Sequence, residues 1–219
     1  ETLKYTFGLS TGLEYSPGLN AKSAELKEIA KVVGKNNRLI MSHMRNEDDD
    51  ELESSISELL EQGEYAKIHI SHLKAVYGKG EKRADEILSI LDSARRNGID
   101  VTAEVYPYTA SYTGIGIVFP IWSKTPEQFQ EAKMNRRDEL ANYLRNRVNR
   151  RNGPEATLLG TPPYTGRTLA SIAHEKEINF EDLLIDEIGP NGASGAYFVM
   201  NDELAVFICL QQGRDAQGT

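Results

Sequence analysis

The chain has 219 residues, of which 39% are hydrophobic and 26% charged, as is usual for a globular protein with one large domain or a domain carrying an insertion. Its formal net charge of −8 argues against nucleic acid as the main partner, because phosphate binding needs a concentrated basic surface. No apolar run reaches the roughly 18 residues of a membrane span, so no membrane partner is expected either. The basic segment 145–151 is interpreted as the solvated end of a helix.

Cys209 is the only cysteine in the sequence, which excludes an internal disulfide. A single thiol is compatible with a reducing compartment, and we expect a cytoplasmic protein. The sequence begins at Glu1, without a basic-then-apolar leader and without an initiator methionine. We interpret it as a processed or excised chain.

The first half of the sequence alternates between strand-like and helix-like segments. Four apolar runs predict strands, at residues 4–9, 38–42, 66–72 and 100–106. Helical spacing of apolar residues predicts three helices between them, at residues 23–34, 47–61 and 82–96. Such alternation implies a parallel sheet with right-handed crossovers. We therefore predict an α/β fold over residues 1–113.

The alternation stops in the second half of the sequence. A long charged helix is predicted at 126–150, and two shorter helices follow it. We predict a mostly helical insertion over residues 114–198, with a lid as one interpretation. For residues 199–219 we predict a helix followed by a disordered polar tail.

Histidines follow two neighbouring strands of the predicted sheet. His43 comes directly after one strand, and His72 ends the next. Because the carboxyl ends of parallel strands meet at one edge, both imidazoles are expected at the same rim. Neutral imidazole is a common zinc ligand, so the pair is a candidate metal site. The alternative is a hydrogen-bonded pair without metal, since two ligands do not complete a zinc site.

Cations and tyrosines follow the same strand ends. Arg45 and Lys74 are candidates for binding a substrate carboxylate, with ordinary ion pairing to the acidic loops as the alternative. Tyr15 and Tyr106 are candidates for donating a hydrogen bond to a developing oxyanion, with packing as the alternative. For Tyr108, packing is favoured.

Three further polar residues are assigned structural roles. Side chains alternate between the two faces of a strand, so His69 is expected to point away from the site and toward the helices. Glu104 is interpreted as an interior polar contact rather than a catalyst. His174 is expected on the surface.

Six segments carry motifs that occur together in one known family. They are GLSTGLEYSPG at 8–18, SHMRNE at 42–47, ISHLK at 70–74, VYPYTAS at 105–111, GTPPYTGRT at 160–168 and SGAYFVM at 194–200. In this order they resemble the D-aminoacylase (N-acyl-D-amino-acid deacylase) family of the amidohydrolase superfamily.

The resemblance implies a zinc-dependent hydrolase that cleaves the amide bond of a small N-acyl-D-amino acid. It implies a (β/α)8, TIM-like barrel, of which this chain would hold four strands, resembling the fourth to the seventh, and the family's insertion. It also implies that His43 and His72 are metal ligands. Lys74, Tyr15 and Tyr106 would match substrate-binding positions.

The sequence also departs from the family's pattern. The His-x-His of the first strand, an early cysteine ligand and the catalytic aspartate are missing, and Cys209 and Asp215 lie in the wrong context to replace them. We therefore interpret the chain as a middle fragment that is inactive or nearly so alone, and that self-associates through its exposed sheet edges. Three alternatives stay open: an amidohydrolase acting on a cyclic amide or imide, a non-catalytic carboxylate-binding module, and a purely structural fragment.

Overall fold

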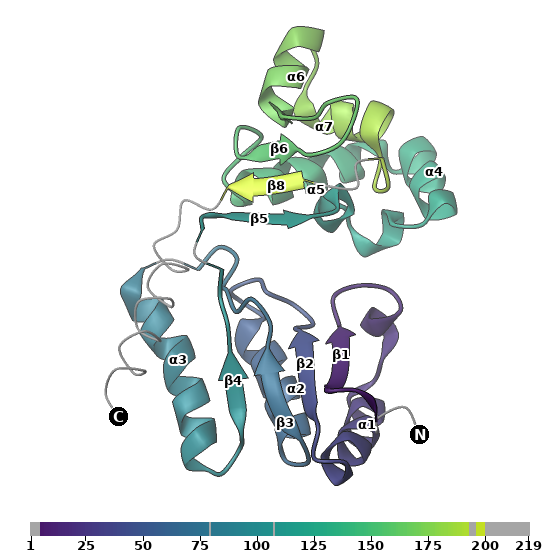
Figure 1. Cartoon of the computed structure of the whole chain (residues 1–219). Helices are drawn as coiled ribbons and strands as arrows, with labels where there is room; N and C mark the ends of the chain where they lie inside the picture. Colours follow the sequence, from purple (N-terminus) through teal and green to yellow (C-terminus); the bar gives the residue numbers. More distant parts are fainter. Residues whose placement is uncertain (1–4, 79, 107, 193–195, 200–219) are drawn as a thin grey trace. The chain divides into compact units, whose positions relative to one another are not determined.

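The computed structural model describes residues 5–78, 80–106, 108–192 and 196–199. These residues form two compact units, which meet in the sequence between Tyr108 and Thr109 (Figure 1). The boundary precedes the one expected at 113–114, because residues 110–113 form a strand of the second unit's sheet. The predicted C-terminal helix and tail lie outside the described residues.

The first unit is built on a sheet of four parallel strands in the order β1-β2-β3-β4. The strands are β1 (Gly8–Gly12), β2 (Leu39–His43), β3 (Lys67–Ile70) and β4 (Val101–Ala103). The helices are α1 (Ser23–Lys35), α2 (Leu52–Gly63) and α3 (Glu81–Arg96), with a short 3-10 turn η2 (Gly18–Asn20) after β1. The predicted α/β fold with four parallel strands is therefore confirmed.

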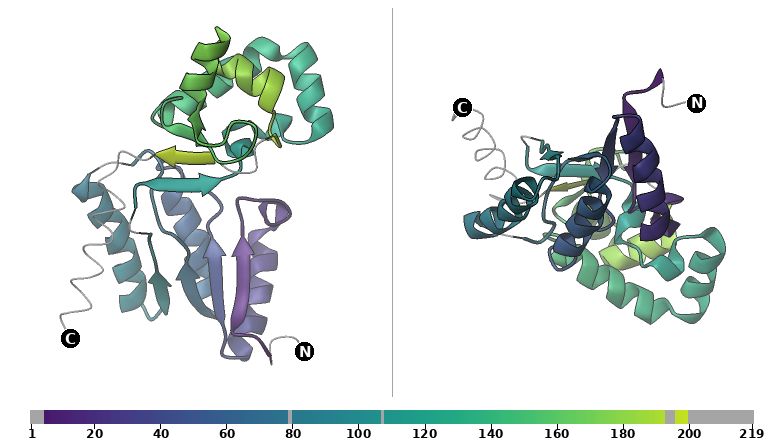
Figure 2. Two further views of the ribbon diagram at one scale, coloured as in Figure 1. Left: turned by 45° about the horizontal axis from the view of Figure 1, so that its top comes forward. Right: turned by 90° about the horizontal axis from the view of Figure 1, so that it is seen from below.

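The helices cover one face of this sheet (Figure 2). Ile40, Ile68 and Val101 lie side by side in register and are almost completely buried. Each helix contributes an apolar stripe at helical spacing, such as Ile56 and Leu59 of α2, which are fully buried. Burying a side chain of this size stabilises the fold by about 1.5–3 kcal/mol relative to exposing it.

His69 lies on the opposite face of the sheet. Ile68 and Ile70 flank it and are buried in the core shared with the helices, whereas His69 lies in register with Thr102 and bonds to it. The prediction that His69 points toward the helices is wrong. Its premise was that residues 66–72 form one strand, but β3 ends at Ile70 and His72 has a φ of +40°. Strand alternation therefore cannot relate His69 to His72.

The second unit is rich in helix, as predicted, and it also contains a four-stranded sheet that the prediction did not include. Its sheet has the order β5-β8-β6-β7, with antiparallel pairing throughout. The strands are β5 (Ala110–Thr113), β6 (Thr157–Leu159), β7 (Arg167–Thr168) and β8 (Ala196–Val199). The helical elements are η3 (Ile115–Val118), η4 (Ile121–Ser123), α4 (Pro126–Asn135), α5 (Arg137–Arg150), α6 (Leu169–Lys176), α7 (Phe180–Leu183) and the π-helical turn η5 (Leu184–Ile188).

The long helix predicted at 126–150 is divided into α4 and α5 at Arg136. Arg136 leaves the helical conformation, with a φ of −136°, and its guanidinium lies over the Trp122 ring, 3.8 Å from the ring centroid. Thr125 and Gln128 form a capping box at the start of α4. Within the described part of the chain, no helix combines the length and the apolar character needed to cross a bilayer.

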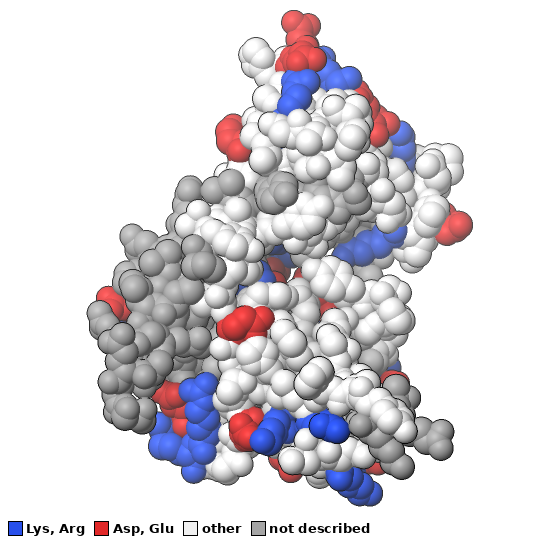
Figure 3. All heavy atoms as spheres, in the orientation of Figure 1, with Lys and Arg blue, Asp and Glu red and all other residues white. Residues whose placement is uncertain are grey.

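Two arginines of the basic segment at the end of α5 are bonded within their own unit. Arg145 forms an ion pair with Glu181, and the buried Arg151 donates a hydrogen bond to Ser111 over 3.3 Å. The interpretation of segment 145–151 as a solvated helix end is therefore wrong for Arg151. On the face shown in Figure 3, positive and negative side chains are interspersed rather than gathered into a patch of one sign.

Candidate metal centre

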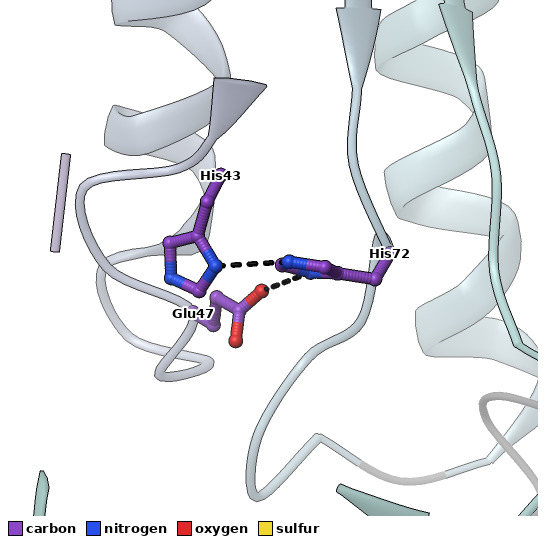
Figure 4. A group of neighbouring side chains, drawn as sticks. All are labelled: His43, Glu47 and His72. Carbon is purple, nitrogen blue, oxygen red and sulfur yellow. Dashed lines mark hydrogen bonds and ion pairs between the residues drawn. The ribbon is translucent and has the colours of Figure 1, made fainter. Parts of the chain in front are cut away.

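The structure brings His43 and His72 together at the carboxyl ends of β2 and β3. His43 is the last residue of β2, and His72 follows the end of β3 by two positions. His43 Nδ1 lies 2.9 Å from His72 Nε2, and the two rings meet edge to face (Figure 4). The parallel register of β2 and β3 explains this proximity, because it places both strand ends at one rim.

Carboxylates contact the outer nitrogen of each ring. Glu14 Oε2 lies 2.8 Å from His43 Nε2, and Glu47 Oε1 lies 3.0 Å from His72 Nδ1. Lys74 Nζ is 3.2 Å from the same His72 nitrogen. If His72 Nδ1 carries the proton it faces Glu47 as a donor, and if it does not it accepts from Lys74.

Glu47 and Lys74 form a buried ion pair beside the histidines. Each residue is 5% exposed, and Lys74 Nζ lies 2.5 Å from Glu47 Oε2. Burial alone would raise the pKa of Glu47, but the contact with His72 and the positive charge of Lys74 outweigh it and lower the pKa from 4.5 to about 2. Glu47 is therefore a carboxylate at neutral pH, despite its burial.

The histidine pair and Glu47 suit a metal ion. One ligand atom from each of His43, Glu47 and His72 lies within 4.8 Å of the others. Two nitrogens bound to a tetrahedral zinc lie about 3.3 Å apart, close to the 2.9 Å between His43 Nδ1 and His72 Nε2. Glu47 presents a buried, ionised carboxylate to this cluster, and a carboxylate is a usual zinc ligand beside imidazole. Catalytic zinc sites have three protein ligands and one open position, so this cluster fits as all or part of a ligand set.

Two of the predicted tyrosines line the same rim. The Tyr15 ring lies 4.8 Å from the His43 ring, centroid to centroid, and Tyr15 is 41% exposed. Lys74 Nζ lies 5.8 Å from the centroid of the Tyr106 ring. Tyr106 in turn stacks on Tyr108, with centroids 4.5 Å apart and planes 13° from parallel. An exposed aromatic ring thus lies beside the metal candidates, and a second ring lies beside the buried ammonium.

Arg45 points to a different part of the first unit. Its guanidinium binds both carboxylate oxygens of Glu58, at 2.8 and 3.0 Å. It also donates to the backbone carbonyls of Leu19 and Ala21, at 3.0 and 2.9 Å. These bonds connect α2 to the loop after β1, which carries Tyr15. Arg45 therefore holds that loop, and its donors already have partners.

Replacing Arg45 with methionine is expected to destabilise the first unit by about 1.5–3 kcal/mol, the range for hydrogen bonds to charged groups. The partly buried Glu58 would lose its bidentate partner, and the loop its two carbonyl contacts. Urea unfolding followed by circular dichroism measures this loss. Arg96→Met is the matched control, because Arg96 is exposed at the end of α3. Unchanged stability with weaker carboxylate binding would instead support a substrate-binding role for Arg45.

Three glutamates at this rim were not identified as site residues from the sequence. Glu47 was assigned to the start of a helix, but α2 begins only at Leu52, so Glu47 belongs to the loop after β2. Glu14 follows β1, and only its position beside Tyr15 in a strand-end loop could have indicated it. Glu104 was interpreted as an interior polar contact, and the structure shows it bonded to the backbone of His72.

Comparisons with known proteins identify relatives in sequence and in fold. No protein-family model matches the chain. An N-acyl-D-glutamate deacylase from Alcaligenes xylosoxydans xylosoxydans is 37% identical over 108 residues, which cover 48% of this chain and 22% of that protein. The crystal structure of N-acyl-D-glutamate deacylase from Bordetella bronchiseptica, complexed with zinc and a phosphonate inhibitor that mimics the tetrahedral intermediate, is 27% identical with a TM-score of 0.66. The match covers 93% of this chain and 37% of that one.

A structure of a D-aminoacylase mutant with copper chloride shares the fold, with a TM-score of 0.63 and 24% identity over 92% of this chain and 36% of that one. The chain thus spans about a fifth of its curated relative and little more than a third of each solved structure. These comparisons confirm the resemblance found in the sequence motifs. In sequence the chain is similar to a segment of N-acyl-D-glutamate deacylases, and in fold it is similar to a segment of these enzymes and of D-aminoacylase.

Proposed function

We propose that this chain is part of a zinc-dependent hydrolase that cleaves the amide bond of N-acyl-D-amino acids, with the first unit as part of a (β/α)8 barrel. The observation that supports this most directly is the pair of facing imidazole nitrogens, His43 Nδ1 and His72 Nε2, beside the buried carboxylate of Glu47. The similarity to N-acyl-D-glutamate deacylases supports the substrate class, since one relative was solved with zinc and a mimic of the tetrahedral intermediate.

In this proposal His43 and His72 would hold the metal, whose role when bound is to polarise the acyl carbonyl and lower the pKa of a water molecule. Lys74 would bind the carboxylate of the amino acid. Its ion pair with Glu47 keeps the ammonium in one place. Arg45 is the weaker candidate for this role, because Glu58 and two backbone carbonyls already occupy its donors.

The two tyrosines would act around the scissile amide. Tyr106 lies beside Lys74 and would donate its hydroxyl proton in a hydrogen bond to the developing oxyanion. Tyr15 packs on His43 with a large part of its ring exposed, and it would cover the acyl group and limit access of bulk water. A general base is still required, and the described group of His43, Glu47 and His72 contains no aspartate to serve as one. We therefore propose that the activity belongs to a longer protein.

The proposal predicts that a longer protein containing this chain will hydrolyse N-acyl-D-amino acids, N-acetyl-D-glutamate among them, and will prefer them strongly over the L-enantiomers. Chelation should abolish the activity and zinc should restore it. The measurement is amine release from a panel of D- and L-substrates, together with cyclic amides and imides. The chain alone should release little or no amine, and should sediment as oligomers formed through the edges of β1 and β4.

Three outcomes would contradict the proposal. Hydrolysis of the cyclic compounds without deacylation would indicate a different amidohydrolase. Tight binding of small carboxylates without any effect of metal would indicate a non-catalytic module. Deacylation by the purified 219-residue chain itself would show that no residue outside it is needed.

A further inference from the structure

His72 adopts an unusual backbone conformation. Its φ of +40° lies in the left-handed region, which residues other than glycine seldom occupy. Such a conformation persists only where surrounding contacts impose it. It ends β3 and turns the chain so that the His72 ring meets the ring of His43. The contacts that hold this backbone therefore also control where His72 Nε2 lies.

Glu104 provides those contacts from the segment that follows β4. Its carboxylate Oε1 accepts a hydrogen bond from the backbone N–H of His72 over 2.9 Å. Its backbone carbonyl accepts from the N–H of Leu73 over 2.8 Å, and its own N–H donates to the carbonyl of Ile70 over 3.2 Å. One residue thus bonds to the chain on both sides of the turn and at His72 itself.

His69 orients this carboxylate. The second carboxylate oxygen of Glu104 contacts His69 Nε2, while His69 Nδ1 lies 2.8 Å from the Thr102 hydroxyl. Both ring nitrogens of His69 therefore have partners, and the imidazole is fixed on the sheet face opposite the helices. The result is a chain of contacts from Thr102 through His69 and Glu104 to the backbone of His72.

We propose that Glu104, oriented by His69, is the positioning residue for His72. It holds the left-handed turn that directs Nε2 of His72 at Nδ1 of His43. Neither Glu104 nor His69 binds the metal or the substrate in this scheme. The effect on metal binding rests on the proposed function, whereas the hold on the His72 backbone does not.

The experiment compares the 15N-labelled chain with Glu104→Ala, Glu104→Gln and His69→Ala. In metal-free protein, the His72 amide proton should exchange with solvent at least ten times faster in Glu104→Ala than in wild type. Glu104→Gln should retain part of the protection, because its amide oxygen can still accept the His72 N–H. His69→Ala should lie between Glu104→Gln and Glu104→Ala. Asp100→Asn is the matched control, since Asp100 pairs with exposed Lys67 at the other end of β4 and should change nothing.

Zinc titration of the same proteins gives the second readout. Glu104→Ala should bind zinc about 10–100-fold more weakly than wild type, the loss usual when a residue that orients a ligand is removed. The amides of Ile68 and Ile70 should keep their protection, which shows that β3 remains folded. A wild-type exchange rate at the His72 amide in Glu104→Ala would overturn the proposal. Wild-type zinc affinity in Glu104→Ala, despite faster exchange at His72, would overturn its link to metal binding. If wild type binds no zinc, the proposed function fails, and the exchange rates still decide the role of Glu104.

Discussion

The His72→Ala variant is expected to bind zinc more than about 100-fold more weakly than the wild-type chain, a larger loss than removal of an orienting residue causes. In the longer protein, deacylation should fall by more than about a thousandfold, because the metal would supply most of the stabilisation of charge on the carbonyl oxygen. His43→Ala should behave similarly, since its Nδ1 faces the same point. Isothermal titration with zinc measures the first effect, and amine release at saturating substrate measures the second.

Two other histidines serve as controls for this prediction. His174 is exposed on α6 in the second unit, so His174→Ala should leave zinc affinity and activity unchanged. His69→Ala should have the intermediate effect expected of a residue that acts through Glu104. If His72→Ala and His69→Ala weaken zinc binding equally, His72 is not a ligand and acts only through the fold. If no histidine variant changes zinc binding, the metal binds elsewhere.

The sequence predicted the first unit well because its signals are local and repeat. The elements and their order follow from two patterns in the sequence. One is the helical stripe, such as that of Ile56 and Leu59, and the other is the apolar strand that ends at His43 or just before His72. Parallel pairing then brings the two strand ends together without further information. The candidate ligands therefore follow from periodicity and from the geometry of α/β sheets.

The partners of those ligands did not follow from the sequence. Glu47 contacts Lys74 and His72 across a loop whose path no periodicity determines. Glu104 bonds to the backbone of His72 at a left-handed turn, and the residue type of His72 does not predict that turn. Arg45 was assigned to the substrate from its position after a strand, but its bonds are made to Glu58 on a helix. Each of these contacts is long-range and depends on side-chain direction.

The second unit shows the same limit for secondary structure. Its strands are short, and β7 has two residues, Arg167 and Thr168, so alternation cannot be recognised in them. They form a sheet only because β8 pairs with both β5 and β6, far apart in the sequence. Helix is easier to recognise here: a long charged helix was predicted at 126–150, where the structure has α4 and α5.

Replacing Lys74 with methionine is expected to destabilise the metal-free first unit by about 3–5 kcal/mol at neutral pH, the usual cost of leaving a buried charge without its partner. Glu47 would remain in the interior, still in contact with His72. The measurement is the free energy of opening from amide hydrogen exchange at Ile68 and Ile70, in the presence of a chelator. Lys67→Met is the matched control, because Lys67 pairs with Asp100 and both side chains are more than half exposed. Its expected cost is below about 1 kcal/mol.

The cost of Lys74→Met should depend on pH in a definite direction. In wild type the pKa of Glu47 is lowered from 4.5 to about 2, so its contribution to stability is complete above about pH 4.5 and is lost as the pH falls toward 2. Without the positive charge of Lys74, less offsets the effect of burial on Glu47, so the pKa of Glu47 should rise. The difference between variant and wild type should therefore be largest near pH 7 and should shrink below about pH 5, where Glu47 of the variant takes up a proton.

A double-mutant cycle separates the unpaired charge from the lost packing of the lysine stem. If the cost comes from the buried carboxylate, Lys74→Met combined with Glu47→Gln should recover about 0.5–3 kcal/mol relative to the sum of the single variants. Additive effects would mean that Lys74 stabilises the unit through its hydrocarbon contacts, such as that with Tyr106, and not through Glu47. A buried ion pair of this kind is retained at a cost in desolvation that an apolar pair would avoid. Its presence beside His43 and His72 is best explained by the site, where Glu47 fixes the ammonium that would receive a substrate carboxylate.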